Sequence, residues 1–534
     1  MSHPFRRPMP IMPRRYRSTM TADHHDVVII GGGHNGLTAG AYLARAGLSV
    51  LLLERDDHLG GATMSAQAFP GVDARLSRYS YLVSLMPRQI IDDLGLDITL
   101  ARRRYASYTP LPGTDTGLLI DHGDPAATAA SFAAIGAEGD AEAWSEFYDR
   151  TSKLASTVWP TMTQPLPRRS AIDAAIGDAS ITTDFLDRPL GGVIEATFAN
   201  DLVRGVVATD ALIGTFADMH EADLRQNICF LYHVIGGGTG DWDVPIGGMG
   251  RVSGELIRAA AESGADMRAA CEVTDLSGES VTWRQDGDEH RTSTNHVLWA
   301  AAPTDLDRLL GTTPTEIEGA QVKVNLMLTR LPRLRDGVDP TAAFGGTFHI
   351  NESYEQLQTA YRQAEQGKFP DPMPAEIYCH SLTDPSILGP DLRATGAQTL
   401  TVFALHVPHR LIAGTTEERA ELQQRVLDSL SSVLAEPIED VLMRDANGNP
   451  CVETKTTLDL ERAIGMTGGN IFHGPLTWPW ATDDEPIDTP AQRWGVASSH
   501  DGILLAGAAS RRGGGVSGLG GYHAAQAVLE HRRT

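Results

Sequence analysis

The stretch DVVIIGGGHNGLTAGAYLARAGLSVLLLE, residues 26–54, decides the fold of this chain. It opens with a β-branched apolar run typical of a buried strand, and this run enters a glycine-rich turn without a spacer. Good helix-forming residues follow until Gly47, at a position where glycine commonly ends a helix. A second apolar run then stops at Glu54. The order of strand, helix and strand predicts a βαβ unit that binds a dinucleotide.

Each glycine of this turn has a mechanical role in dinucleotide binding. Gly31 makes the tight turn, Gly33 allows the backbone to approach the pyrophosphate, and Gly36 allows the helix to pack closely on the strand. The free amides and the positive dipole at the start of the helix suit the phosphates. Glu54 lies where a carboxylate accepts hydrogen bonds from the ribose hydroxyls. Three glycines at this spacing are common by chance, so the prediction depends on the flanking strand, helix and acid.

The residues after Glu54 distinguish FAD from NAD. The run RDDHLGGAT, residues 55–63, carries a second glycine pair where the chain passes close to the cofactor again. Here the sequence resembles FAD-dependent oxidoreductases of the glutathione-reductase-like fold, whose acidic residue is followed by such a pair. The resemblance implies an α/β fold with an FAD-binding Rossmann domain. It implies these cofactor contacts from the first segment: Gly31, Gly33, His34, Asn35, Gly36, Glu54, Arg55, Gly60, Gly61 and Ala62.

A second glycine-rich turn lies near the C-terminus. Residues 502–507 predict a buried strand, residues 513–521 are mostly glycine, and a helix is expected over residues 522–530. Flavoproteins that resemble this chain fold their C-terminal segment back, so that such a turn meets the ribityl chain and the flavin ring. The resemblance therefore implies further cofactor contacts from Gly507, Gly514, Gly515 and Val516.

The middle of the chain is expected to contribute to the same domain. The turn Gly247-Gly248-Met249-Gly250 leads into a helix predicted over residues 252–261. Residues 266–273 predict one strand, which contains the further cofactor candidate Val273. Asp286-Gly287 has the chemistry of a tight hairpin turn, and residues 296–302 predict a strand that returns to the nucleotide domain.

We therefore expect a discontinuous FAD-binding domain and a second, sheet-plus-helix (α+β) domain that covers the flavin and holds the substrate. Residues 322–328 and 399–407 alternate with the period of a strand. Thr415 has capping-box chemistry and starts a helix that continues towards Leu434. The FAD-binding domain is predicted over residues 23–90, 240–310 and 465–534, and the substrate or cap domain over residues 91–239 and 311–464.

Four segments together carry a wider resemblance. They are residues 33–37 (GHNGL), residues 77–85 (SRYSYLVSL), the turn at residues 247–250, and residues 469–474 (GNIFHG). On these segments the chain resembles the FAD-dependent phytoene desaturase and amine oxidase superfamily, and within it the branch of pyridine nucleotide-disulfide oxidoreductase domain-containing protein 2. The resemblance implies that FAD removes hydride from an organic, apolar substrate. It implies oxygen, a quinone or another non-nicotinamide compound as the electron acceptor.

Two features separate this chain from a disulfide reductase. Its four cysteines, Cys229, Cys271, Cys379 and Cys451, are far apart in sequence, so neither a redox-active dithiol nor a metal site is predicted. A second nucleotide fingerprint is also absent. In the nearest match, residues 234–240, Asp241 stands where the last glycine belongs, and Pro245 prevents the required helix. NAD(P)H is therefore not the predicted electron partner.

The sequence identifies no acid–base catalytic group. Flavin hydride transfer mainly requires that a C–H bond of the substrate be placed over the flavin ring. His473, Tyr79 and Tyr81 are candidates for the substrate pocket because they lie in segments that resemble the superfamily. Trp478 and Trp480 are expected either to stack on a substrate or to belong to the core.

Arg511 and Arg512 stand where related desaturases have His-Pro before the C-terminal glycines. A guanidinium facing the flavin would favour the anionic reduced ring and hold an acidic substrate. If both side chains point to solvent, the change has no effect on the reaction.

Composition limits the partners and the compartment. The 534 residues carry a net charge of -24, which opposes binding to nucleic acid or to an anionic membrane. No apolar run reaches the length of a membrane-spanning helix, although peripheral membrane contact stays open. A cytoplasmic protein with a small-molecule substrate is expected. The Arg-rich head, residues 1–22, is expected to be a disordered tail; a mitochondrial transit peptide and a true start at Met20 are the alternatives.

Two alternative functions stay open at this point, an amine oxidase and a flavin-binding interaction protein. An amine oxidase would need an aromatic cage beside the flavin, which sequence does not reveal. Rab GDP dissociation inhibitors share the expected fold and bind a protein partner without flavin, but Glu54 and both glycine-rich turns are intact in this chain. A flavin-binding interaction protein with little turnover is the second alternative.

Overall fold

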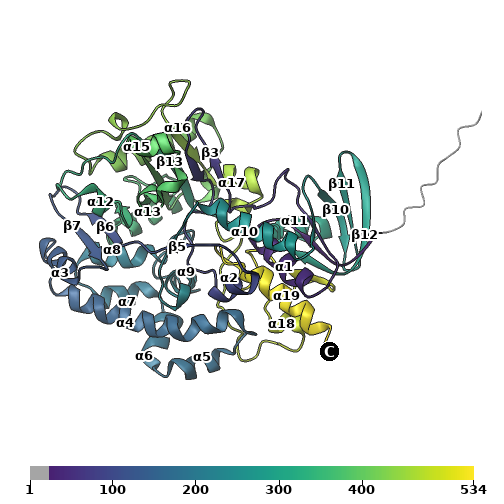
Figure 1. Cartoon of the computed structure of the whole chain (residues 1–534). Coiled ribbons are helices and arrows are strands. Elements are labelled where there is room, and N and C mark those ends of the chain that lie inside the picture. The colour runs from purple at the N-terminus through teal and green to yellow at the C-terminus, as the bar shows by residue number, and fades with distance from the viewer. Residues whose placement is uncertain (1–22, 534) are drawn as a thin grey trace, which may run out of the picture.

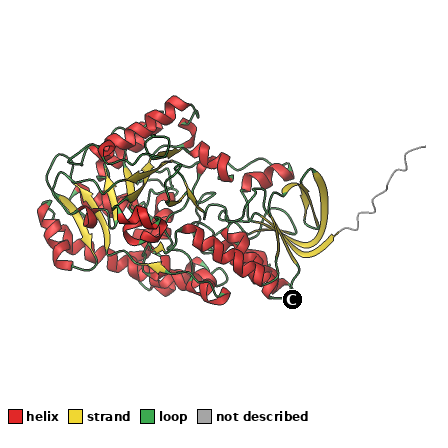
Figure 2. Ribbon diagram, turned by 45° about the horizontal axis from the view of Figure 1, so that its top comes forward, coloured by secondary structure: helices red, strands yellow, loops and turns green. Residues whose placement is uncertain are grey.

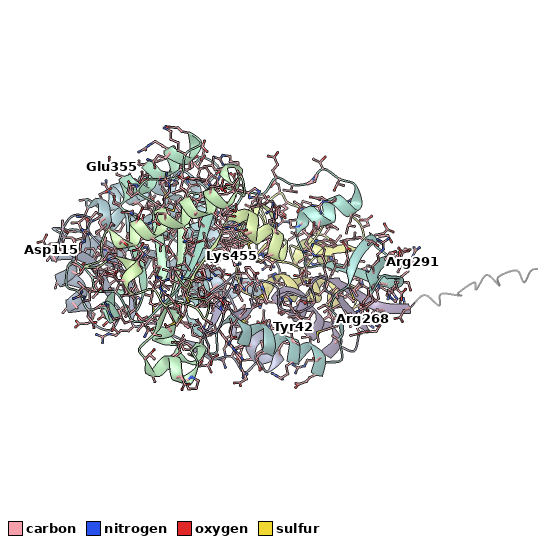
Figure 3. The ribbon with its side chains drawn as sticks, turned by 90° about the horizontal axis from the view of Figure 1, so that it is seen from above. Tyr42, Asp115, Arg268, Arg291, Glu355 and Lys455 are labelled. Carbon is pink, nitrogen blue, oxygen red and sulfur yellow. The ribbon has the colours of Figure 1, made fainter. Side chains whose placement is uncertain are left out.

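The computed structural model describes residues 23–533. The predictions of an Arg-rich tail and of a start at Met20 lie outside the described residues. Two seven-stranded sheets organise the chain. Figure 2 shows these sheets towards opposite ends of the molecule, with helices around and between them. In Figure 3, Arg268 and Arg291 mark the end that holds the first sheet, and Asp115 and Glu355 mark the opposite end.

The first sheet is a Rossmann sheet extended by an antiparallel meander. Strands β9, β2, β1, β12 and β18 run parallel, and β10 and β11 join the sheet through β12. Figure 1 shows the meander projecting at one end. The strands come from three segments far apart in the chain: β1 (Asp23–Ile30), β2 (Val50–Leu53), β9 (Asp266–Arg268), β10 (Glu272–Ser277), β11 (Ser280–Gln285), β12 (Asp288–Trp299) and β18 (Ile503–Leu505).

The predicted βαβ unit is confirmed. Helix α1 (His34–Arg45) connects β1 to β2, and the last four residues of β1 and all of β2 are buried, as their apolar runs require. Helices α10 (Met249–Glu262) and α19 (Leu519–His531) pack against α1. Figure 1 places the C-terminal α19 directly beside the N-terminal α1. The contact needs glycine, because a Cβ on Gly521 would lie 1.8 Å from the carbonyl oxygen of Asn35.

Most local predictions in the first sheet are confirmed, and one is wrong. The hairpin turn at Asp286 and Gly287 has φ values of 53° and 88°. Residues 266–273, however, are not one strand. The amides of Ala270 and Cys271 donate to the carbonyls of Asp56 and Glu54, both at 2.7 Å, and Ala270 adopts a φ of 55°. These bonds turn the chain out of β9 before β10 begins at Glu272.

The second sheet has the order β17-β13-β16-β15-β14-β6-β7. The predicted strands at residues 322–328 and 399–407 are β13 and β16, the two strands that follow the edge strand β17 in this order. One face is apolar and packs on helix α16 (Thr416–Ser431). The opposite face carries buried polar side chains such as Lys323, Asn325 and Glu376. The strands are β6 (Tyr105–Pro110), β7 (Gly117–Asp121), β13 (Gln321–Leu328), β14 (Thr347–Ile350), β15 (Ala375–Tyr378), β16 (Gln398–Leu405) and β17 (Val452–Lys455).

The remaining elements are helices and short strand pairs. Thr415 caps α16 by accepting from the amide of Glu418 at 3.1 Å, but the Glu418 carboxylate returns to Ala413 and Gly414, so the predicted capping box is only half formed. Along the chain, the segment between β7 and β8 (Val244–Pro245) forms a layer of helices: α3 (Pro125–Ala134), α4 (Asp140–Val158), α5 (Arg169–Ile176), α6 (Ala179–Thr182), α7 (Leu190–Thr197), α8 (Asp201–Thr209) and α9 (Arg225–Val234).

The other helices are α2 (Arg88–Leu94), α11 (Pro303–Leu310), α12 (Pro340–Ala343), α13 (Tyr354–Glu365), α14 (His380–Thr383), α15 (Pro390–Ala394), α17 (Thr457–Ile464) and α18 (Pro490–Arg493). The short strands are β3 (Ser65–Gln67), β4 (Arg75–Ser77), β5 (Leu100–Ala101) and β8 (Val244–Pro245). Within residues 23–533, none of the helices combines the length and apolar character required to span a bilayer.

The Glu436 carboxylate links the segment after α16 to the loop after β13, and these contacts predict a pH-dependent contribution to stability. Glu436, whose side chain is 10% exposed, accepts from both terminal nitrogens of Arg330 at 2.7 and 2.9 Å and from the amide of Arg333 at 3.0 Å. The Arg330 guanidinium and the Arg333 amide hold the pKa of this carboxyl well below its usual range. We expect E436Q to lower the free energy of unfolding at pH 7 by about 1–2 kcal/mol.

Because the folded-state pKa is depressed, this stabilisation is fully present above the unfolded pKa of about 4.3 and is lost as the pH falls below it. The difference between wild type and E436Q in urea unfolding should therefore stay nearly constant from pH 7 to about pH 5 and shrink as the pH falls below about 4.3. E439Q, at an exposed neighbouring carboxylate, serves as the control and should stay within about 0.5 kcal/mol of wild type. An E436Q effect that does not diminish at low pH would contradict the electrostatic explanation.

Candidate functional site

Two cavities meet at the carboxyl end of the Rossmann strands. The smaller has a volume of about 430 Å³ and the larger about 760 Å³. Four residues line both cavities: His34, Ala62, His473 and Ala508. The two spaces therefore adjoin and follow one path, from the βαβ turn to the polar face of the second sheet. Predicted cofactor residues that line the smaller cavity are Gly31, Gly33, His34, Asn35, Glu54, Arg55, Gly61, Ala62 and Val273.

The glycines of the βαβ turn have different environments. A Cβ on Gly36 would lie 2.0 Å from the carbonyl oxygen of Gly31, so this glycine allows α1 to start against the turn. Gly31 has a φ of 106° and its added Cβ would lie 2.8 Å from the carbonyl of Ala300. Gly33 differs, because nothing lies closer to its added Cβ than Gly61 Cα at 4.0 Å. The chain is thus open to a ligand at Gly33, and no side chain caps the N-terminus of α1 there.

Glu54 is held by the backbone around it. One carboxylate oxygen accepts from the amide of Gly32 at 2.7 Å, and the other accepts from the amide of Asp56 at 2.9 Å. The side chain also lines the smaller cavity. A carboxylate has about four lone-pair positions, so Glu54 retains acceptor capacity for a hydroxyl donor in that cavity.

The C-terminal glycine turn reaches the larger cavity through part of its length. Gly515 and Val516 line that cavity, and the Gly515 carbonyl lies 3.1 Å from His34 Nε2. Gly507 and Gly514 do not line either cavity. An added Cβ would lie 3.2 Å from the Ala300 backbone at Gly507 and 2.7 Å from a Leu476 methyl at Gly514. Gly36 and Gly60 likewise line neither cavity, and an added Cβ on Gly60 would lie 3.3 Å from Ser253.

The three predicted pocket residues His473, Tyr79 and Tyr81 all line the larger cavity. His473 adopts a left-handed φ of 62°. Burial lowers the pKa of His473 to about 4. Burial, and to a lesser degree His473, lowers the pKa of His34 to about 4 as well. Both imidazoles are therefore neutral at pH 7 and offer hydrogen bonds without charge at the junction of the two cavities.

Arg511 and Arg512 do not face the cavities. The Arg512 guanidinium donates to the carbonyls of Thr161 at 3.0 Å, Gln164 at 2.8 Å and Trp494 at 3.2 Å. Arg511 donates to the Trp480 carbonyl at 3.1 Å and to Glu485. The Arg512 side chain is almost completely buried and so does not point to solvent, and neither arginine lines either cavity. Trp478 and Trp480 stack on each other at 5.1 Å and line neither cavity.

The larger cavity has an apolar side and an acidic side. Apolar side chains that line it are Phe132, Trp144, Val206, Ile213, Phe403, Ile471 and Phe472. Asp210, His349 and Glu376 line the acidic side. Burial raises the pKa of Glu376 to about 8 and that of Asp210 to about 6. The sequence does not reveal this group, because His349 and Glu376 meet only through the pairing of β14 with β15.

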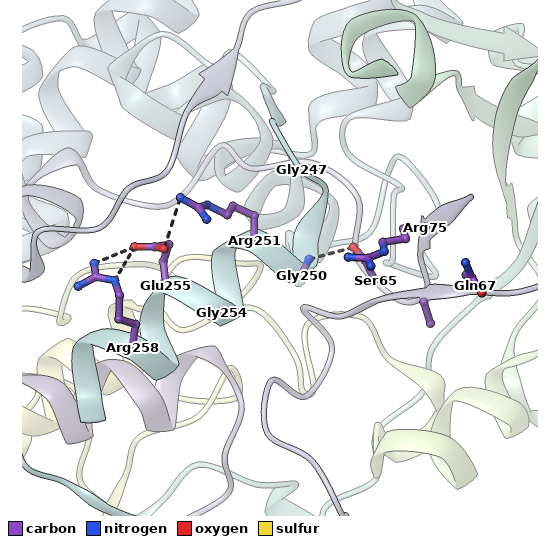
Figure 4. Close-up of a pocket in the computed structure, with 10 residues that line it drawn as sticks. Ser65, Gln67, Arg75, Gly247, Gly250, Arg251, Gly254, Glu255 and Arg258 are labelled. Atoms are coloured by element: carbon purple, nitrogen blue, oxygen red, sulfur yellow. Dashed lines mark hydrogen bonds and ion pairs between the residues drawn. The ribbon is translucent and has the colours of Figure 1, made fainter. Parts of the chain in front are cut away.

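A third space is a groove of about 830 Å³ beside α10 (Figure 4). It shares no lining residue with the two cavities. Its arginines Arg251 and Arg258 lie 3.5 and 2.7 Å from Glu255, and the Gly250 amide donates to Ser65 at 2.9 Å. Much of the charge and the helix terminus of this groove are therefore already satisfied within the protein.

Comparison with known proteins supports the assignment of a nucleotide-binding domain at the N-terminal end of the chain. The model of an NAD(P)-binding Rossmann-like domain matches residues 29–88. An uncharacterized protein of Mycobacterium tuberculosis is 55% identical over 94% of this chain and 97% of its own length. Pyridine nucleotide-disulfide oxidoreductase domain-containing protein 2 of Mus musculus is 28% identical over 95% of this chain and 93% of its own length.

Solved structures agree on the fold. A variant of putrescine oxidase superposes with a TM-score of 0.55 at 16% identity, over 95% of this chain and 99% of that one. Cyclohexylamine oxidase from Brevibacterium oxydans gives a TM-score of 0.54 at 17% identity, over 96% and 100% of the two chains. The chain therefore belongs to the family of this mycobacterial protein, is similar to pyridine nucleotide-disulfide oxidoreductase domain-containing protein 2 over nearly its whole length, and has the fold of these amine oxidases.

Proposed function

We propose that the protein is an FAD-dependent oxidoreductase that removes hydride from an organic substrate with a large apolar portion. The observation that carries this proposal is the pair of adjoining cavities. The smaller begins at the βαβ turn and Glu54, as the adenosine end of a dinucleotide requires, and the larger has room beside the C-terminal glycine turn for a redox ring and a substrate.

The residues present fit FAD. The open position at Gly33 and the uncapped start of α1 suit the pyrophosphate, and the remaining acceptor positions of Glu54 suit the adenosine ribose. Gly515 and Val516, beside His34, would meet the ribityl and ring end. When bound, FAD supplies the hydride acceptor.

The protein's own contribution is orientation and exclusion of water. The apolar side of the larger cavity would hold the substrate with a C–H bond directed at the ring, because Phe403, Ile471 and Phe472 leave few hydrogen-bonding positions for water. The neutral imidazoles of His34 and His473 add no charge at the junction. We propose oxygen, a quinone or another non-nicotinamide compound as the acceptor, since the sequence carries no second nucleotide fingerprint for NAD(P)H. The four cysteines are buried and unpaired, which argues against a redox-active dithiol.

We propose that each of the two sheets forms the centre of one domain. The strands of the first sheet fall within residues 23–90, 240–310 and 465–534, which we propose as the FAD-binding domain. The strands of the second sheet and the helices α3 to α9 fall within residues 91–239 and 311–464, which we propose as the substrate domain.

The test begins with the purified protein. We expect a yellow protein that releases one FAD per chain on denaturation, identified by chromatography. Colourless protein that cannot be reconstituted with FAD would refute the proposal. If FAD is present, anaerobic mixing with a panel of polyenes, amines and acyl compounds should identify the substrate class as the one that bleaches the flavin.

A further inference from the structure

A histidine and two glutamates converge on the acidic side of the larger cavity. His349 on β14 lies directly opposite Glu376 on β15 in the antiparallel register. The chain then turns at Asn351, with a φ of 54°, and brings the Glu352 carboxylate back to within 2.5 Å of His349 Nδ1. One donor atom from each of His349, Glu352 and Glu376 lies within 4.8 Å of the other two.

These groups are buried with too little positive charge around them. His349, Glu352 and Glu376 are 4%, 1% and 3% exposed, and Asp210 adds a further carboxyl on the same side of the cavity. Arg103 is the nearby cation, but its guanidinium donates to the Trp242 carbonyl and the Thr347 hydroxyl instead of to a carboxylate. Buried carboxylates require a proton, a paired charge or a metal.

Two buried polar atoms at the cluster have no partner. The second carboxylate oxygen of Glu352, Oε1, makes no hydrogen bond although the residue is almost completely buried. The hydroxyl of Thr109 is also unpaired and buried. Thr109 follows Tyr108, which pairs with Phe348 in parallel register, so its side chain shares the sheet face of His349. Unsatisfied buried atoms of this kind are uncommon and point to a missing ligand.

We propose that His349, Glu352 and Glu376 bind one divalent transition-metal cation in the wall of the larger cavity. One imidazole nitrogen and two carboxylate oxygens form a donor set suited to Zn²⁺, Mn²⁺ or Fe²⁺, whereas Ca²⁺ and Mg²⁺ prefer oxygen alone. The cation would replace the hydrogen bond between His349 and Glu352 and would compensate the excess negative charge. His349 and Glu376 line the cavity while Glu352 lies behind them, so a coordination position would face the cavity.

The inference goes beyond the proposed flavin chemistry and does not depend on it. The metal ligands lie on the second sheet, and none of them is among the residues proposed to hold FAD. Failure of metal binding would leave the FAD assignment unaffected, and the reverse also holds.

The experiment is metal titration of the full-length, FAD-loaded protein after dialysis against a chelator. Binding of Zn²⁺, Mn²⁺ and Fe²⁺ is measured by equilibrium dialysis with elemental analysis, the Fe²⁺ arm under anaerobic conditions. We expect one ion per chain, with affinity that falls at lower pH because the ligands must lose protons. E352Q and E376Q should each weaken binding at least about 10-fold.

E195Q is the matched control. Glu195 lies 2.9 Å from His220 Nε2, which makes a similar His–Glu pair, but within residues 23–533 it belongs to no three-residue group of metal-ligating side chains. The E195Q variant should bind the metal ion with the same affinity as wild type. Circular dichroism and the flavin spectrum show whether each variant is folded; if E352Q or E376Q is not, the wild-type stoichiometry decides. No bound ion in wild type, or unchanged affinity in folded E352Q and E376Q, would overturn the proposal.

Discussion

G33D is expected to give a folded protein that has lost FAD. Residue 33 has a φ of -73° and a ψ of 176°, an extended conformation that any residue adopts. An added Cβ meets no atom closer than 4.0 Å, so the side chain would extend into the smaller cavity without disturbing the turn. There its carboxylate would occupy the proposed pyrophosphate position and repel the phosphates. We expect the Kd for FAD to rise at least about 100-fold, or about 2.8 kcal/mol.

The comparison with G36A separates cofactor binding from folding. A Cβ at position 36 would lie 2.0 Å from the Gly31 carbonyl oxygen, so G36A should lose folded structure and FAD together. FAD titration and circular dichroism of both variants are the measurements. If G33D retains one FAD per chain, the assignment of the smaller cavity to the pyrophosphate is wrong. If G36A folds as wild type does, the steric argument fails.

R512A is expected to be the most destabilising substitution outside the βαβ turn. The wild-type guanidinium is almost completely buried and satisfies three carbonyls from two separate segments, residues 161–164 and Trp494. Alanine would leave these carbonyls unpaired and create a cavity, at a cost of roughly 3 kcal/mol or more. Burial lowers the pKa of Arg512 to about 9, so the charge is present at pH 7 and its removal offsets part of that cost.

R511A provides the comparison, because the neighbouring guanidinium is 25% exposed and its pairing with Glu485 is partly solvated. We expect R511A to change the free energy of unfolding by about 1 kcal/mol or less in urea unfolding. R512A should also weaken FAD binding, since Gly515 and Val516 follow Arg512 in the turn that lines the larger cavity. Equal stability of R511A and R512A would contradict the role of the buried guanidinium.

The predictions that the structure confirms depend on local signals. Strand, turn and helix at residues 26–54 follow from apolar periodicity and glycine spacing, which act over a few residues. The same holds for the hairpin at Asp286 and Gly287 and for the strands at residues 322–328 and 399–407. The single strand expected over residues 266–273 failed because the bonds that break it come from Glu54 and Asp56, distant in sequence.

In the candidate site, too, some positions could be predicted from local sequence and others depend on tertiary packing. Eight of the ten residues expected near the cofactor within residues 31–62 line the smaller cavity, because a glycine or acid beside a turn is positioned by that turn. The place of Arg512 was not predictable, since its acceptors Thr161, Gln164 and Trp494 reach it only through the packing of two segments distant in sequence on the glycine turn.

The sequence by itself thus determined that this chain has a dinucleotide-binding βαβ unit and a second glycine-rich turn near its C-terminus. Only the tertiary structure decided which glycines face a cavity and which serve packing, because that depends on atoms such as the Ala300 backbone and Leu476 from other segments. It alone also brought His349, Glu352 and Glu376 together. Their meeting depends on the register between β14 and β15 and on a left-handed turn at Asn351, and neither leaves a periodic pattern in the sequence.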